Sequence, residues 1–132
     1  MNYILDTHTF LWSIFNSKRL PTHLKEIILN SDNSIYISSI TFWEISLKYS
    51  LGKLELENVL PDDLPSVSKE AGFEILDITF EELASFYKLP AIGHKDPFDR
   101  LIIWQAINND ITVISQDIKF QDYKKFGLKI IW

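Results

Sequence analysis

Short apolar runs alternate with segments of helical periodicity along the whole chain. Runs rich in β-branched and aromatic residues predict strands, at residues 3–6, 34–38, 73–78, 112–115 and 128–132. Between them, apolar positions recur every three or four residues, which predicts helices, at residues 7–15, 21–32, 40–53, 65–72, 79–89 and 97–109, with a turn or short helix at 118–127.

Several residues predict where these helices begin and end. Pro21 suits the first turn of a helix, because its missing N–H would have no partner there. Gly52 and Gly72 are typical of helix C-terminal ends. The spacing Thr79-x-x-Glu82 is a capping-box signature for the N-terminus of the helix at residues 79–89.

The alternation of apolar strands and helices predicts an α/β fold. We expect a doubly wound, mainly parallel sheet of about five strands flanked by helices, because strands buried on both faces show little polar alternation. The 132 residues and the lack of any linker predict one domain over residues 1–132. In such sheets, ligands bind beyond the carboxyl ends of the strands.

The composition excludes several classes of protein and predicts a cellular compartment. Hydrophobic residues make up 46% of the chain and aromatics 14%, which excludes a disordered polypeptide. The chain has no cysteine, so a disulfide framework, a thiolate metal site and a cysteine nucleophile are excluded. No apolar run approaches the roughly 20 residues that span a bilayer. The N-terminal "MNYILD" reads as a strand without a basic leader, so we expect a cytoplasmic protein with no membrane association.

Four acids follow strands or lie in the early turns of helices. Asp6 ends the first strand, and Asp117 lies two residues beyond the strand at 112–115. Glu44 and Asp99 lie in the early turns of two helices. In a doubly wound sheet such positions can converge on one edge.

Each of these acids also has a purely structural interpretation. Carboxylates at helix N-termini accept backbone N–H groups and favour the helix dipole, by about 0.3–1 kcal/mol each. Asp117 fits an ordinary turn. Asp96, directly before a proline, is the strongest candidate for a cap without another role. The patterns that fit capping are Asp6 before residues 7–15, Thr41-x-x-Glu44 and Asp96-x-x-Asp99.

Four converging carboxylates would need a counter-charge. At separations of about 5 Å, each pair repels by roughly 3 kcal/mol at an effective dielectric constant of about 20. Six such pairs exceed a typical folding stability of about 5–15 kcal/mol. The cluster must therefore protonate or bind cations, and hard oxygen ligands select Mg²⁺ or Mn²⁺. The net charge of −5 is atypical of a nucleic-acid binder, but bound cations would reverse the local sign.

Four stretches together resemble the PIN-domain ribonucleases, and among them the VapC-type toxins of type II toxin–antitoxin pairs. The resemblance covers nearly the whole chain, in the order and at the spacing of the family. The combination of D-T-H, W-E-I-x-x-K and D-P-F-D-R is specific. The stretches are "ILDTHTFLW" (4–12), "SSITFWEISLKYSLGKL" (38–54), "HKDPFDRLIIWQA" (94–106) and "VISQDIKFQDY" (113–123).

The resemblance implies a PIN-like fold and a metal-dependent endoribonuclease. It implies that one or two Mg²⁺ or Mn²⁺ ions are held by Asp6, Glu44, Asp99 and Asp117, which would be both catalytic and metal-binding. Asp96 would be an accessory residue, and cleavage would leave a 5′-phosphate and a 3′-hydroxyl. Lys95, Thr41 and Ser115 stand where the family commonly has arginine, serine and threonine, and none of these departures removes an acid.

Cations near the acids are candidates for contacts with RNA phosphates. They are Arg100, Lys95, His94 and Lys48. Arg100 could instead pair with Asp96 four residues earlier on a helix. His8 and His94 lie close to acids, although histidines at such positions are more often structural.

Partners follow partly from the resemblance. VapC-type toxins form homodimers and bind a cognate antitoxin, and transfer RNA is a common substrate that nothing in this sequence selects. The early aromatic residues exceed what two helices need for a core, so they fit either core packing or a groove for a partner helix. These residues are Phe10, Trp12, Phe15, Phe42 and Trp43.

Two other functions remain open at this point. In a non-catalytic binding module the acids would only cap helices. In a Mg²⁺-dependent phosphoryl-transfer enzyme Asp6 would be the nucleophile. Such enzymes usually carry a second acid in D-x-D, whereas Thr7 and His8 follow Asp6 here.

Overall fold

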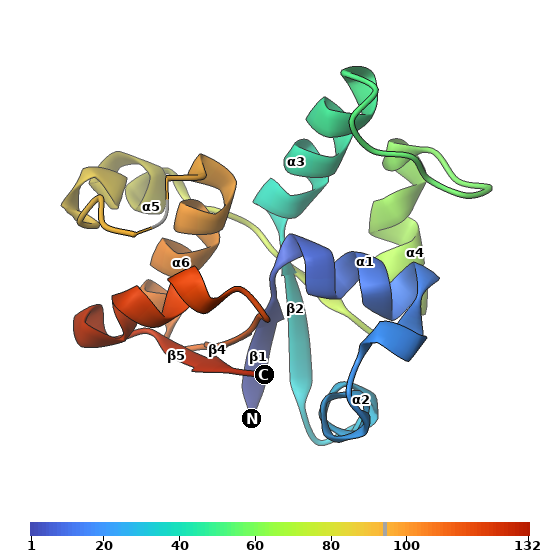
Figure 1. Cartoon of the computed structure of the whole chain (residues 1–132), viewed down its shortest axis with the longest axis horizontal. Coiled ribbons are helices and arrows are strands. Elements are labelled where there is room, and N and C mark those ends of the chain that lie inside the picture. Colours follow the sequence, from blue (N-terminus) through green and yellow to red (C-terminus); the bar gives the residue numbers. More distant parts are fainter. Residues whose placement is uncertain (94) are drawn as a thin grey trace.

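A parallel sheet lies at the centre of the computed structural model, which describes residues 1–93 and 95–132 (Figure 1). Within these residues the sheet has five strands in the order β3-β2-β1-β4-β5, and every neighbouring pair is parallel. This confirms the predicted α/β class and sheet. The strands are β1 (Asn2–Leu5), β2 (Ser34–Ser38), β3 (Glu74–Leu76), β4 (Thr112–Ile114) and β5 (Lys129–Ile131).

Helices separate the strands along the chain. The α-helices are α1 (Thr7–Phe15), α2 (Thr22–Leu29), α3 (Ser39–Ser50), α4 (Leu64–Glu70), α5 (Phe80–Ser85) and α6 (Pro97–Asn109). The 3₁₀-helices are η1 (Ser17–Arg19), η2 (Pro61–Asp63), η3 (Phe86–Lys88) and η4 (Ile118–Phe126). Within the described part of the chain, no helix has the length and apolar character that crossing a bilayer requires.

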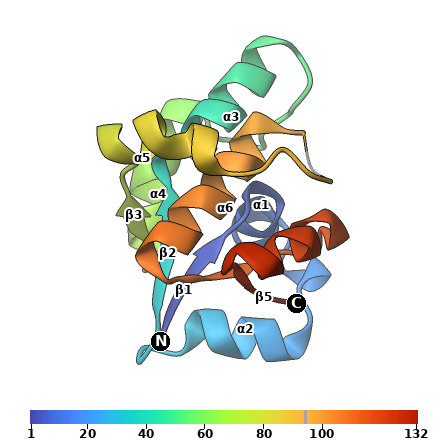
Figure 2. The same ribbon diagram turned by 90° about the vertical axis from the view of Figure 1, so that its left-hand side faces the viewer.

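The sheet is covered on both faces, as the apolar strands predict. On β1, Ile4 packs in a core that includes residues of α6 and η4. Its neighbour Leu5 packs in a second core with residues of α1, α2 and α4. Successive side chains of a strand point to opposite faces. Figure 1 shows α5 and α6 on one side of β1 and β2, and α1 and α4 on the other, and Figure 2 views the molecule from the side of α5 and α6.

The chain changes direction across the sheet between β1 and β4. From β1 it proceeds to β2 and β3 on one side, and it then crosses back to β4 and β5 on the other. The carboxyl ends of β1 and β4 are therefore neighbours at the point where the strand order reverses. In open α/β sheets this is where ligands bind.

Local capping shifts several predicted boundaries. Asp6 is the N-cap of α1 instead of the last residue of a strand, and Pro21 is the N-cap residue of α2 instead of a first-turn residue. The capping box predicted for Thr41 and Glu44 is wrong, because α3 begins at Ser39 and Ser38 caps it by accepting from the Ile40 N–H. Glu44 therefore lies beyond the first turn.

Other signals are confirmed. The reciprocal Thr79–Glu82 capping box is present at α5. Gly52 follows the C-terminal end of α3 with a positive φ of 70°, a conformation that glycine adopts without steric cost. The predicted helix at 79–89 divides into α5 and η3, and the segment at 118–127 is the 3₁₀-helix η4.

Candidate metal centre

Asp6 is anchored at the end of β1 by two hydrogen bonds. Its Oδ1 accepts from the Thr9 N–H at 2.8 Å, which caps α1. Its Oδ2 accepts from the hydroxyl of Ser115, just beyond β4. The side chain is buried, and burial raises the pKa of Asp6, while the bonds from Ser115 and Thr9 act to lower it. The predicted cap is confirmed, and it orients the carboxylate at the switch point.

Glu44 is buried in α3 with a donor on each of its oxygens. The Thr7 hydroxyl donates to Oε1 at 2.6 Å, and the Lys48 ammonium forms a salt bridge with Oε2. Glu44 is 2% exposed, so Lys48 supplies its counter-charge inside the protein. Partial burial acts to lower the pKa of Lys48. The hydrogen bond and charge of Glu44, with the charges of Asp96 and Asp99, outweigh it and raise that pKa.

Asp99, in the first turn of α6, lies within the electrostatic reach of all the other acids. Its pKa is raised to about 8, first by burial and then by the negative charges of Asp96, Glu44, Asp6 and Asp117. An acid experiences such neighbours only when they converge on it. The structure therefore brings together residues that lie far apart in the sequence.

Asp96 and Asp117 each cap a helix beside this cluster. Asp96 accepts from the N–H groups of Phe98 at 2.8 Å and Asp99 at 3.1 Å, so its predicted capping role at α6 is confirmed. Asp117 accepts from the Lys119 N–H at 2.9 Å and caps η4. Capping and membership of the acidic cluster are compatible, because both place a carboxylate at a helix start.

The donor chemistry of this cluster fits a hard divalent cation. The oxygens are carboxylate oxygens. Burial is the largest cause of the raised pKa of Asp99, and the neighbouring negative charges, whose repulsion a cation would relieve, add to it. Among residues 1–93 and 95–132, no three acidic or histidine side chains already surround one point closely enough to ligate an ion.

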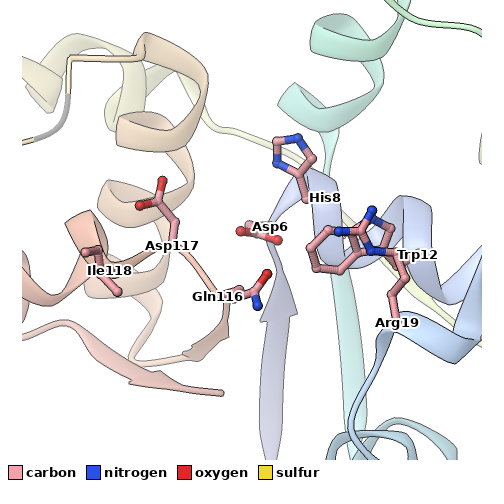
Figure 3. A pocket seen from close by; sticks show the side chains of 7 residues that line it. All are labelled: Asp6, His8, Trp12, Arg19, Gln116, Asp117 and Ile118. Atoms are coloured by element: carbon pink, nitrogen blue, oxygen red, sulfur yellow. The ribbon is translucent and has the colours of Figure 1, made fainter.

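A cavity of about 350 Å³ opens beside Asp6 and Asp117. Figure 3 shows Asp6 between Asp117 on one side and His8 and Trp12 on the other. The lining residues are Asp6, His8, Trp12, Arg19, Gln116, Asp117 and Ile118. Sequence analysis did not single out Arg19 or Gln116.

The proposed RNA-contacting cations have different environments. Lys95 is exposed, and Lys48 is held by Glu44. The Arg100 guanidinium donates to the Leu89 carbonyl at 2.9 Å and lies 4.7 Å from the Phe86 ring centre, so its contacts are with the protein. The prediction for His94 falls outside the described residues.

The early aromatic residues divide between core and surface. Phe10 is fully buried, and Phe42 packs against it at 6.0 Å between ring centres. Trp43 is 59% exposed and meets the edge of Phe98, whereas Trp12 lines the cavity. Core packing therefore accounts for only part of the set.

Ser115 and Thr7 are site residues that sequence reasoning missed. Each donates a hydroxyl to one of the buried acids, Ser115 to Asp6 and Thr7 to Glu44. A small hydroxyl residue carries no distinctive sequence signal. Both nevertheless lie within two residues of a candidate acid, and both occur in the quoted motif stretches.

Comparison with known proteins supports one family. The model of the PIN domain matches residues 3–126 of this chain. A search of curated protein sequences gave no significant match.

Solved structures share the fold at low sequence identity. One is VapBC2 from Rickettsia felis bound to a promoter DNA fragment, with a TM-score of 0.69, 22% identity, and coverage of 99% of this chain and 98% of that chain. Another is DNA-bound VapBC from Salmonella typhimurium, with a TM-score of 0.67, 24% identity, and coverage of 99% and 97%. A third is VapBC-1 from nontypeable Haemophilus influenzae, with a TM-score of 0.68, 20% identity, and coverage of 99% and 97%.

Proposed function

Because this chain belongs to the PIN domain family, we propose that it is a metal-dependent endoribonuclease and the VapC-type toxin of a toxin–antitoxin pair. The observation that carries the proposal is the convergence of four negative charges on the half-buried Asp99, whose pKa is raised to about 8 by burial first and then by these charges. A protein without a bound cation gains nothing from such repulsion. A metal-dependent phosphodiesterase would bind divalent cations at such a cluster and use them in hydrolysis.

The proposed ligands are Asp6, Glu44, Asp99 and Asp117, with Asp96 as an accessory residue and Mg²⁺ or Mn²⁺ as the cofactor. When bound, such a metal lowers the pKa of a coordinated water and stabilises charge on the phosphate. The protein supplies the orientation. Ser115 holds the carboxylate of Asp6, and Thr7 holds that of Glu44.

The four acids have different roles in this proposal. Glu44 is already paired with Lys48, so we assign to Glu44 either a second ion or the orientation of the attacking water. Asp6 and Asp99 hold the main ion in this proposal, and Asp117 joins them directly or through water. Hydrolysis would leave a 5′-phosphate and a 3′-hydroxyl.

The proposed partners are RNA, a cognate antitoxin and a second copy of the chain. Lys95 is the exposed cation nearest in sequence to the capped start of α6 and is the first candidate for a phosphate contact, with Lys48 and His94 as further candidates. Arg100 is already engaged by the Leu89 carbonyl and the Phe86 ring. The solved structures of similar fold are described as VapBC proteins, which supports an antitoxin partner. We place this activity in the cytoplasm, where its RNA substrate is found.

A non-catalytic binding module is the second candidate function. The observation in its favour is that Asp6, Asp96 and Asp117 all cap helices. Capping does not account for Glu44, which is buried in the middle of α3, or for the placement of Asp99 among like charges. The nuclease therefore explains more of the site.

RNA cleavage by the purified protein tests the proposal. We expect cleavage with Mg²⁺ or Mn²⁺, none with EDTA, and none by Asp99→Asn. Asp32→Asn is the matched control, because this exposed aspartate lies in the turn before β2, at the amino ends of the strands and away from the acids. Cleavage in EDTA, or full activity of Asp99→Asn, would contradict the proposed centre.

A further inference from the structure

The cavity beside the acids has a second wall of different chemistry, which consists of His8, Trp12 and Arg19 (Figure 3). We refer to these three residues as the stacking wall. The Arg19 guanidinium lies 4.5 Å from the centre of the Trp12 ring. The His8 ring centre is 6.0 Å from that of Trp12. None of the three is required to hold the proposed metal.

The stacking wall is built on rigid elements but faces solvent. Trp12 is part of α1 and is half-buried, and the ring of Trp132 packs against it in an edge arrangement at 6.0 Å. Arg19 and His8 are exposed. Within residues 1–93 and 95–132, Arg19 forms no salt bridge. A positive charge over an aromatic ring therefore lines a cavity whose opposite side carries two carboxylates.

We propose that the stacking wall binds the RNA nucleotide next to the scissile phosphate. The nucleobase stacks on the Trp12–Arg19 pair, and Arg19 contacts a backbone phosphate. Single-stranded RNA is bound in this way, by aromatic rings and guanidinium planes that accept every base, together with cations that follow the backbone. Gln116, also exposed at the cavity, offers an amide to a base edge. This inference rests on the proposed ribonuclease function.

The charge arrangement favours a nucleotide over a basic peptide. A peptide cation would be drawn to Asp6 and Asp117 but would meet the like charge of Arg19 at the same cavity. A nucleotide would satisfy both sides, because its phosphate would meet Arg19, while a cation held by the acids would offset their charge next to the adjoining phosphate. The Trp12 ring adds an aromatic surface on which a nucleobase can stack.

Trp12 is tested first, by the binding of a fluorescent single-stranded RNA oligonucleotide. The parent is Asp99→Asn with Mg²⁺, so that the RNA is not cut. Trp12→Leu should weaken RNA binding by about 5- to 150-fold, the range for loss of one base–aromatic stack. Trp12→Phe should retain most of the affinity. Polyphosphate, which carries the charges of a backbone without bases, should compete equally well against both variants.

Arg19 is tested by the salt dependence of the same binding. The association constant K for RNA should fall with salt less steeply in Arg19→Gln. The slope of log K against log[salt] should be shallower by about 0.7, the contribution of one phosphate contact to a single strand. Lys18→Gln is the matched control. It removes the same charge from the neighbouring residue of η1, which is exposed and does not line the cavity, so its slope should remain that of the parent.

The outcomes separate this inference from the proposed function. If wild-type protein cleaves RNA but Trp12→Leu and Arg19→Gln bind RNA like the parent, the stacking wall is not a nucleotide site. If these variants lose binding of a hexa-arginine peptide and keep RNA, the wall recognises a peptide instead. If wild-type protein neither cleaves nor binds RNA, both the proposed ribonuclease function and this inference are wrong. Should Trp12→Leu not fold, the salt dependence of Arg19→Gln against Lys18→Gln still decides the question.

Discussion

The hydroxyl of Ser115 donates to Asp6, 109 residues earlier in the chain, and accepts from the Asp117 N–H at 3.1 Å. One small side chain thereby ties two proposed metal ligands together across neighbouring strands. Ser115 therefore links the residue that follows β1 to the loop that follows β4, where the two acids lie.

Removal of this hydroxyl should weaken metal binding. In Ser115→Ala the pKa of the buried Asp6 should rise further, because the hydrogen bond that lowers it is lost. We expect the Mn²⁺ concentration for half-saturation to increase by about 10-fold or more, as for other residues that orient metal ligands. Mn²⁺ binding followed by electron paramagnetic resonance measures this directly. Ser115→Thr should restore the affinity, and Ser50→Ala, an exposed serine on α3, should not change it. An unchanged affinity in Ser115→Ala would contradict the orienting role.

The raised pKa of Asp99 predicts a stability that falls as pH rises, in the absence of metal. Asp99 binds its proton more tightly in the folded chain, with a pKa of about 8, than at its ordinary value of 3.8. The folded state therefore carries more protons between these values, so stability is fully present below the lower pKa and is lost towards the upper one. Urea unfolding in EDTA at about pH 5.5 and about pH 8.5 spans most of this window.

Asp99→Asn should remove the part of this dependence that Asp99 causes, while the buried Asp6, whose pKa is also raised, keeps its own part. The neutral amide no longer repels Glu44, Asp6 and Asp117, so we expect a gain of about 1–3 kcal/mol in the free energy of unfolding above pH 8. Asp32→Asn should leave the wild-type pH profile in place. A wild-type protein equally stable at both pH values in EDTA would show that the acids do not interact as the structure indicates.

Sequence patterns predicted the elements and the sheet well, because buried parallel strands and amphipathic helices leave strong local signals. Boundaries were displaced where capping decided them. The helix that carries Glu44 begins at Ser39 because Ser38 caps it, and this placed Glu44 in the buried middle of the helix. A single serine at a strand end gives a weaker signal than the spaced Thr41-x-x-Glu44 pattern, which in this chain is not a capping box.

The candidate site was predicted only as a set of acids. Their convergence depends on strand order, which no local pattern encodes, and the cations that line the cavity depend on it as well. Arg19 lies in a 3₁₀-helix without any motif, and only the fold brings it to the cavity beside Asp6. The hydrogen-bonding roles of Thr7 and Ser115 were not predicted, because a small hydroxyl residue carries no distinctive sequence signal.

Lys48 should compete with a metal for Glu44. In Lys48→Met the carboxylate of Glu44 loses its internal counter-charge, so the metal-free protein should lose about 1–3 kcal/mol of stability at neutral pH. Mn²⁺ should then bind more tightly and stabilise the variant more than it does the wild type. Thermal unfolding with and without Mn²⁺ measures both effects. Lys53→Met, an exposed lysine after the same helix, should behave like wild type. Weaker Mn²⁺ binding in Lys48→Met would show that Lys48 supports the metal instead.

Arg100 should contribute to stability through packing. Arg100→Met keeps an apolar stem but loses the hydrogen bond to the Leu89 carbonyl and the contact with Phe86, so we expect the free energy of unfolding to fall by about 1–2 kcal/mol.

Lys95→Met is the informative comparison, because Lys95 is exposed just before the start of α6 and should affect RNA binding without affecting stability. Removal of a phosphate contact lowers the slope of log K against log[salt] by about 0.7. Of these two variants, we expect this change only in Lys95→Met. The same change in Arg100→Met, with unaltered stability, would assign Arg100 to RNA and overturn its packing role.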